Sequence, residues 1–118
     1  RNLIDMKIAV IGSRSFSNSK LVDEELSKVL NKVTLIASGG AKGADTLAEN
    51  WANSNNLPTK IFLPDFKNFA GGAYFVRNKK IVNECNLLIA FWSGASKGTK
   101  NTITYAKKMG KEVWVIGG

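Results

Sequence analysis

Histidine is absent from this sequence, and cysteine and proline are scarce. The absence of histidine excludes Ser–His and Cys–His nucleophilic catalysis and the usual zinc sites, so Asp, Glu, Lys and Arg are the remaining candidates for chemistry. The single cysteine, Cys85, cannot form an internal disulfide, which is typical of a reducing compartment. No apolar run approaches the ~20 residues that span a bilayer. We therefore expect a cytoplasmic protein with no metal site, no cofactor and no membrane partner.

Basic residues outnumber acidic ones, with 17 Lys and Arg against 9 Asp and Glu and a net charge of +8. This balance favours an anionic partner, such as a nucleotide or a nucleic acid. The lysines are spread along the chain, which also suits plain solubility, so nucleic acid is possible but not favoured. With 118 residues, 44% of them hydrophobic, the chain is expected to form one domain over residues 1–118, with residues 1–6 flexible or foreign to it.

Short apolar strands alternate with amphipathic helices along the whole chain. The expected strands are 7–11, 33–37, 60–63, 87–92 and 112–116. The expected helices are one capped by Asn18 or Ser19, one along 44–52, one over 73–84 and one over 99–109 ended by Gly110. The first helix places Val22, Leu26, Val29 and Leu30 on one face. This alternation predicts an α/β fold: a Rossmann-like, three-layer, doubly wound sandwich with a five-stranded parallel sheet of order 3-2-1-4-5.

Three loops that follow expected strands are rich in glycine and serine. They are Gly12-Ser13-Arg14-Ser15, the segment 38–45 and the segment 93–99. In a sheet of this order the three loops converge beyond the carboxyl ends of the strands, where ligands bind. Turn geometry and helix capping account for one such loop, whereas three together favour a phosphate-binding pocket. Neither a Walker A motif nor a Gly-x-Gly-x-x-Gly fingerprint is present, so an ordinary ATPase or dinucleotide dehydrogenase is not supported.

The predicted ligand-binding residues lie in these loops and on the helix over 73–84. They are Gly12, Ser13, Arg14, Ser38, Gly39, Gly40, Ala41, Lys42, Gly43, Asp45, Arg77, Asn78, Trp92, Ser93, Gly94, Ser96, Gly98 and Thr99. Arg14 is placed to clamp a phosphate, and Arg77, on an otherwise apolar helix line, faces either the ligand or a structural ion partner. Trp92 either packs in the core or stacks on a base. Asp45 either stabilises a helix end or is the one candidate catalytic group.

Together these motifs resemble the YspA/YpsA-related, YAcAr-like branch of the SLOG superfamily. The resemblance rests on Gly12-Ser13-Arg14, the segment 38–45 with Ala48, Arg77-Asn78, and Phe91-Trp92 with the loop up to Gly98-Thr99. These motifs occur in this order along nearly the whole chain. The superfamily is named for Smf DNA-processing proteins and LOG phosphoribohydrolases, and the resemblance implies a Rossmann-like fold.

The resemblance implies that the loops at Gly12, Gly39 and Gly98 bind a nucleotide or a nucleotide-derived signal, such as an ADP-ribose-like molecule. It further implies a sensor or sequestering protein of a bacterial or phage conflict system, assembled as a homodimer or higher homo-oligomer. In such an assembly, Arg77 or the segment 69–74 is expected to serve the neighbouring site.

One departure from the resembling enzymes bears on catalysis. The phosphoribohydrolases carry Gly-Gly-x-Gly-Thr-x-x-Glu, whereas here Thr102 stands at the glutamate position after Gly98-Thr99. The missing carboxylate disfavours hydrolysis, because an oxocarbenium-like transition state and an attacking water both need one nearby. Cleavage of a nucleotide N-glycosidic bond, with Asp45 as base and Arg77 orienting the phosphate, remains the first alternative. Single-stranded DNA binding, suggested by the net charge, is the second.

Overall fold

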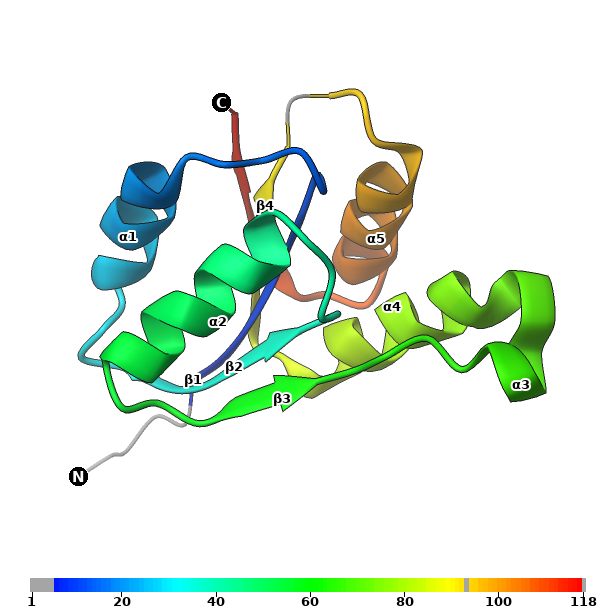
Figure 1. The fold of residues 1–118 in the computed structure, drawn as a ribbon, viewed down its shortest axis with the longest axis horizontal. Coiled ribbons are helices and arrows are strands. Elements are labelled where there is room, and N and C mark those ends of the chain that lie inside the picture. The colour runs from blue at the N-terminus through cyan, green and yellow to red at the C-terminus, as the bar shows by residue number, and fades with distance from the viewer. Residues whose placement is uncertain (1–5, 93, 118) are drawn as a thin grey trace.

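The computed structural model describes residues 6–92 and 94–117, which form a parallel sheet between two layers of helices (Figure 1). The strands are β1 (Met6–Gly12), β2 (Val33–Ser38), β3 (Thr59–Ile61), β4 (Leu87–Phe91) and β5 (Glu112–Ile116). The helices are α1 (Ser19–Ser27), α2 (Ala44–Ser54), α3 (Phe66–Phe69), the 3₁₀ helix η1 (Ala70–Gly72), α4 (Ala73–Glu84) and α5 (Lys97–Lys108). The strand order is β3-β2-β1-β4-β5 and every pairing is parallel, which confirms the predicted Rossmann-like architecture.

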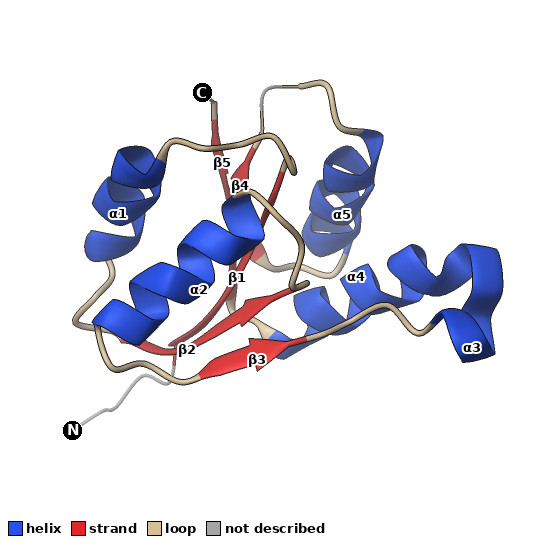
Figure 2. Cartoon of the chain, viewed as in Figure 1, coloured by secondary structure: helices blue, strands red, loops and turns tan. Residues whose placement is uncertain are grey.

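The two faces of the sheet carry separate hydrophobic cores, because successive side chains of a strand point to opposite faces. In β1, Ile8 and Val10 pack with buried residues of α1 and α2, whereas Ala9 and Ile11 pack with those of α4 and α5. Figure 2 shows the same division, with α1 and α2 on one side of the sheet and α4 and α5 on the other. The central strands are therefore apolar on both faces, which explains why they appear as unbroken apolar runs in the sequence.

At helix α1, the structure confirms Asn18 as the N-cap and shows that the expected burial of Leu30 is wrong. The side chain of Asn18 accepts a hydrogen bond from a backbone N–H of the first turn at 3.0 Å, so Asn18 is the N-cap. Val22, Leu26 and Val29 are buried as predicted, but Leu30 is 41% exposed. The helix ends at Ser27, and the turns that follow carry Leu30 off the apolar face. In the described part of the chain, no helix has the length and apolar character needed to cross a membrane.

The segment 66–72, which lies between the expected strand at 60–63 and the expected helix over 73–84, forms α3 and η1. Asp65 caps α3, since its carboxylate accepts the backbone N–H of Asn68 at 3.1 Å and the side-chain amide at 2.7 Å. A helix of one turn is too short to show a helical period in the sequence. Together with the start of α4, these short helices project at one end of the molecule (Figure 1). Phe66 and Phe69 are exposed there.

The carboxyl ends of β1, β2 and β4 meet at one edge of the sheet. Gly12, which ends β1, pairs with Phe91, which ends β4. The loop after β1 also contacts the start of α2, where the carbonyl of Ser13 accepts the backbone N–H of Ala44 at 3.4 Å. The loops that the sequence singled out are therefore neighbours in space.

Candidate functional site

A cleft of about 460 Å³ lies at this edge of the sheet. The predicted residues that line it are Gly12, Ser13, Arg14, Ala41, Asp45, Arg77, Asn78, Ser96, Gly98 and Thr99. They come from the loops after β1, β2 and β4 and from the helices α2, α4 and α5. The structure thus brings the three predicted loops and α4 together around one cavity, at the point where the strand order reverses.

Four residues line the cleft that were not among the predicted ligand contacts: Ile11, Tyr74, Ile81 and Thr102. Two of them carry a usable sequence signal. Tyr74 lies four residues before Asn78 and Thr102 four residues after Gly98, which is the spacing of neighbours on one helix face. Ile11 and Ile81 carry none, because a buried isoleucine at a cavity floor has the same sequence pattern as any core isoleucine.

The other predicted residues of the described chain are not part of the cleft wall: Ser38, Gly39, Gly40, Lys42, Gly43, Trp92 and Gly94. Ser93 lies outside the described residues. The hydroxyl of buried Ser38 donates to the carboxylate of Glu49, and the indole N–H of Trp92 donates to the carbonyl of Ser96 at 3.1 Å. Trp92 also packs against the core on the α4 and α5 side. Its contacts hold the loop before α5 in place and match the packing interpretation.

Two of the loop glycines are required by the packing around the cleft. A Cβ at Gly39 would overlap the guanidinium of Arg77. A Cβ at Gly43 would overlap the carbonyl of Ser13, and the φ of Gly43 is +79°, a conformation that side chains disfavour. These glycines let α4 and the β1 loop approach the β2 loop closely. Direct contact between either glycine and a ligand stays a prediction.

Arg77 reaches from α4 to the loop after β2. Its Nη1 donates to the carbonyl of Gly39 at 2.6 Å and to that of Phe62 at 3.3 Å, and its Nε donates to the side-chain oxygen of Asn78 at 2.8 Å. Burial lowers the pKa of this guanidinium, while the charge of nearby Asp45 opposes the decrease. Arginine stays protonated in proteins, so the cleft wall holds a fixed positive charge. Arg77 therefore supports the loop and faces the cavity at once.

Asp45 shapes the same loop from the first turn of α2. Its side chain is buried, and Oδ2 accepts the backbone N–H groups of Gly39 at 3.0 Å and Ala41 at 3.2 Å. Burial raises the pKa of this carboxyl from 3.8 to about 6, and the two N–H bonds and the charge of Arg77 limit the rise. The carboxylate thus binds the loop backbone, and a catalytic role for it stays a prediction.

The ring of Tyr74, which lines the cleft, lies close to two cations. The guanidinium carbons of Arg14 and Arg77 are 5.6 Å and 5.5 Å from the centroid of this ring. Within the part of the chain that the structure describes, the guanidinium of Arg14 has no hydrogen-bond acceptor and no carboxylate partner. Its N–H donors are therefore free for an anion in the cleft.

Helix α5 begins at the opposite wall. Ser96 caps it, with Oγ accepting from the backbone N–H and the hydroxyl of Thr99 at 3.3 Å and 3.1 Å. The hydroxyl of Thr102 donates to the carbonyl of Gly98 at 2.9 Å, so the residue at the glutamate position is already engaged within the helix. A Cβ at Gly98 would meet open space. The positive end of the α5 dipole therefore borders the cleft at Gly98.

The fold and the position of this cleft define a Rossmann-like domain with its candidate site at the topological switch point. Within that class, the chain belongs to the YspA, cpYpsA-related SLOG family, YAcAr, whose family model matches residues 6–69. The resemblance found in the motifs is confirmed.

Three proteins illustrate the relationship. The chain is 27% identical over 120 residues to the Gene 61 protein of Mycobacterium phage D29, covering 94% of this chain and 96% of that protein. DNA processing protein A from Streptococcus pneumoniae aligns with a TM-score of 0.82 and 25% identity over 98% of this chain. The Helicobacter pylori protein of that name, whose structure describes a single-stranded DNA binding mode, aligns over 95% of this chain with a TM-score of 0.75 and 19% identity, which shows a shared fold. This chain spans 52% and 65% of these two structures.

Proposed function

We propose that the cleft binds the phosphate of a nucleotide or nucleotide-derived signal, such as an ADP-ribose-like molecule, for sensing or sequestration. The main support for this proposal is that three groups with full or partial positive charge border one cavity at the carboxyl edge of the sheet. They are Arg14, Arg77 and the N-terminus of α5. A guanidinium offers two parallel N–H donors to a phosphate, and a helix N-terminus offers backbone N–H groups. The net charge of +8 favours the approach of such a ligand.

Binding without hydrolysis fits the side chains better than cleavage of a glycosidic bond does. Among the described residues that line the cleft, Asp45 supplies the one carboxylate, and its Oδ2 accepts two backbone N–H groups. The hydroxyl of Thr102 is bonded to the helix backbone. Hydrolysis with Asp45 as base remains the alternative, and turnover of a nucleoside monophosphate that is lost in Asp45→Asn would favour it.

Substitution of Gly98 by aspartate tests the proposal. Gly98→Asp places a carboxylate in the cleft, and the added side chain has open space and a favourable charge for a helix first turn. Gly72→Asp is the control, because Gly72 also lies at a helix N-terminus, as the N-cap of α4, has open space around its Cβ and is outside the cleft wall. Nucleoside monophosphates and ADP-ribose are titrated into each variant by calorimetry, with a thermal-shift measurement alongside.

The proposal predicts that at least one of these ligands binds the wild type and raises its melting temperature by several degrees. Ligand at ~100 times its dissociation constant adds about 2.7 kcal/mol to the free energy of unfolding. Gly98→Asp is expected to weaken that ligand at least about tenfold, through like-charge repulsion near a partly buried site, whereas Gly72→Asp keeps the wild-type affinity. Binding that is equal in the two variants, or absent from the wild type, contradicts the proposal.

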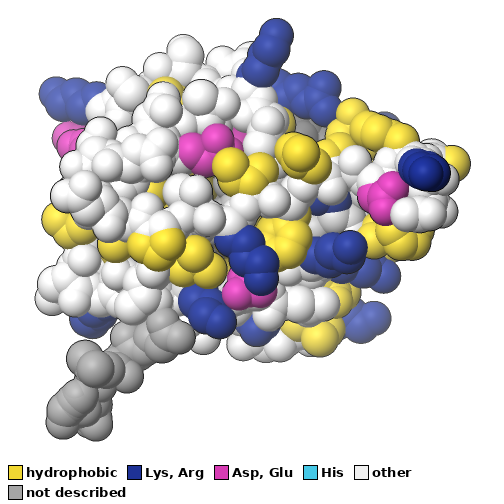
Figure 3. Space-filling view, turned by 60° about the horizontal axis from the view of Figure 1, so that its bottom comes forward, with side chains coloured by type: hydrophobic (Ala, Val, Ile, Leu, Met, Phe, Trp, Pro, Cys, Tyr) yellow, Lys and Arg dark blue, Asp and Glu magenta, His cyan; other side chains and the backbone are white. Residues whose placement is uncertain are grey.

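Single-stranded DNA is a second candidate ligand. It is supported by the net charge of +8 and by the similarity to the Helicobacter pylori DNA processing protein A. Figure 3 shows Lys and Arg side chains interleaved with hydrophobic ones on the face toward α3 and α4, a combination that suits single strands. Anisotropy of a labelled oligothymidine is expected to show an affinity that decreases steeply with salt. Absence of binding at low salt contradicts this candidate.

A further inference from the structure

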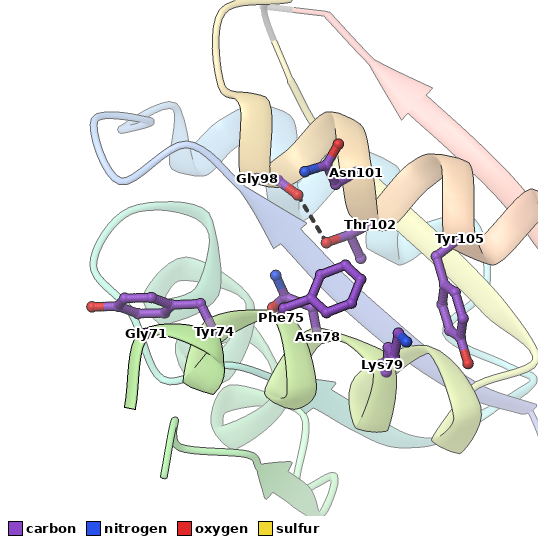
Figure 4. A pocket seen from close by; sticks show the side chains of 9 residues that line it. All are labelled: Gly71, Tyr74, Phe75, Asn78, Lys79, Gly98, Asn101, Thr102 and Tyr105. Carbon is purple, nitrogen blue, oxygen red and sulfur yellow. Dashed lines mark hydrogen bonds between the residues drawn. The ribbon is translucent and has the colours of Figure 1, made fainter. Parts of the chain in front are cut away.

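A second cavity, of about 190 Å³, lies between α4 and α5 (Figure 4). Tyr74, Asn78, Gly98 and Thr102 line both this groove and the phosphate cleft. The two cavities therefore share a rim, and the groove continues the cleft along the two helices. A ligand whose phosphate lies in the cleft has room for its next chemical group in the groove.

Aromatic rings form the walls of the groove beyond that rim. Phe75 projects from α4 and Tyr105 from α5, with Lys79 between them (Figure 4). The Nζ of Lys79 lies 4.5 Å from the centroid of the Phe75 ring and 5.5 Å from that of Tyr105. Phe75 is 54% exposed, so a large part of its ring is open to a ligand. An exposed aromatic ring beside a cation suits a planar, polarisable ring.

Polar side chains lie on the same walls. Asn78 is at the rim, and Asn101 of α5 is among the lining residues (Figure 4). Among the described residues, the side-chain amide of Asn101 has no hydrogen-bond partner. An amide offers both donors and an acceptor, and the ammonium of Lys79 adds donors, so the groove can pair with the mixed polar edge of a heterocycle.

We propose that this α4–α5 groove binds the nucleobase of the ligand whose phosphate occupies the adjacent cleft, with the base stacked on Phe75. The inference rests on the proposed function and narrows its ligand class to base-bearing nucleotides, as opposed to sugar phosphates or inorganic phosphate. The shared rim favours a ring linked to a phosphate over an unattached apolar side chain of a partner protein, because the anion of such a ligand lies beside Arg14 and Arg77.

The test compares a ligand with a base and a ligand without one. Ribose 5-phosphate and the four common nucleoside monophosphates are titrated by calorimetry into the wild type, Phe75→Ala and Phe75→Trp. Phe69→Ala is the matched control, because Phe69 is another exposed phenylalanine of the same projecting region and lines neither cavity. Phe75 lines the groove but not the cleft, so its removal leaves the phosphate contacts intact.

The wild type is expected to bind its preferred nucleoside monophosphate about 5- to 150-fold more tightly than ribose 5-phosphate, the range that one base–aromatic stack provides. Phe75→Ala reduces this ratio toward one with the ribose 5-phosphate affinity unchanged, while Phe75→Trp and Phe69→Ala retain it. Three results would overturn the base site but leave the phosphate cleft standing. The first is equal binding of both ligands to the wild type. The others are an affinity ratio that Phe75→Ala leaves unchanged, or one that Phe69→Ala removes as fully as Phe75→Ala does. Binding of neither ligand overturns this inference, and if ADP-ribose does not bind either, the proposed function is overturned with it.

Discussion

Replacing Asp45 by asparagine tests how the structure accounts for the loop between β2 and α2. Asp45 is 6% exposed, and its carboxyl accepts two backbone N–H groups of that loop. Asparagine keeps the size of the side chain and an oxygen acceptor but carries no charge. The substitution therefore keeps part of the stabilisation by the hydrogen bonds but removes the free-energy cost of burying a charge.

The effect on stability depends on pH in a defined direction. Burial raises the pKa of Asp45 from 3.8 to about 6, so the folded state holds the proton more tightly than the unfolded chain does. The resulting stabilisation is complete below about pH 4 and is lost as the pH rises through about 6. At 1.36 kcal/mol per pH unit, the wild type loses about 3 kcal/mol of unfolding free energy across this window because of Asp45. Asp45→Asn does not show this loss.

Urea unfolding from pH 4 to pH 8 measures the difference directly. Asp45→Asn is expected to gain up to about 3 kcal/mol relative to the wild type between the two ends of this range, with most of the change between pH 4 and pH 6.5. Asp23→Asn, on the exposed side of α1, controls for the loss of one negative charge. A free-energy difference between Asp45→Asn and wild type that stays constant with pH refutes the buried, proton-binding carboxyl described above.

Two further predictions concern packing and are measured by thermal or urea unfolding. Gly39→Ala is expected to destabilise the protein by about 1–3 kcal/mol, because the added Cβ overlaps the guanidinium of Arg77, whereas Gly71→Ala, whose Cβ meets open space, changes little. Equal effects of the two alanines would show that the close approach of Arg77 is wrong. Leu26→Ala is expected to cost about 2–5 kcal/mol and Leu30→Ala less than about 1 kcal/mol, since Leu26 is fully buried and Leu30 is 41% exposed. A similar cost at both positions contradicts the end of α1 at Ser27.

The fold was predictable because each strand and each long helix has a hydrophobic pattern within its own short segment of sequence. Each central strand is buried on both faces and is therefore an apolar run, and α2 buries Ala44, Ala48, Trp51 and Ala52 at helical spacing. The alternation of such segments leaves few parallel topologies, and the observed strand order is the expected one. The short helices at 66–72 were not predictable, because a single turn capped by Asp65 has no periodic pattern.

The sequence predicts where in the fold the candidate site lies better than it predicts which residues line it. Loops at the carboxyl edge of a parallel sheet converge, so the meeting of Ser13, Ala41 and Gly98 around one cleft follows from topology. The sequence does not show whether the space left by a glycine without a Cβ is used by a ligand or by a neighbouring side chain. At Gly39, the space is used by the guanidinium of Arg77. Nor does the sequence reveal that α4 contributes Ile81 to the cleft, since a core isoleucine has the same sequence pattern whether or not it borders a cavity.

The most direct test of the central claim is to map phosphate binding onto the backbone by amide NMR. Inorganic phosphate is added to the wild-type protein at low salt while the amide resonances are followed. Phosphate binding in the cleft predicts saturable shifts concentrated in the residues of the loops and adjoining helix starts that line it, which are Gly12, Ser13, Arg14, Ala41, Asp45, Gly98 and Thr99. Shifts that are absent from these loops, or that are concentrated in the separate groove between α1 and α2 beside Lys20, would contradict it.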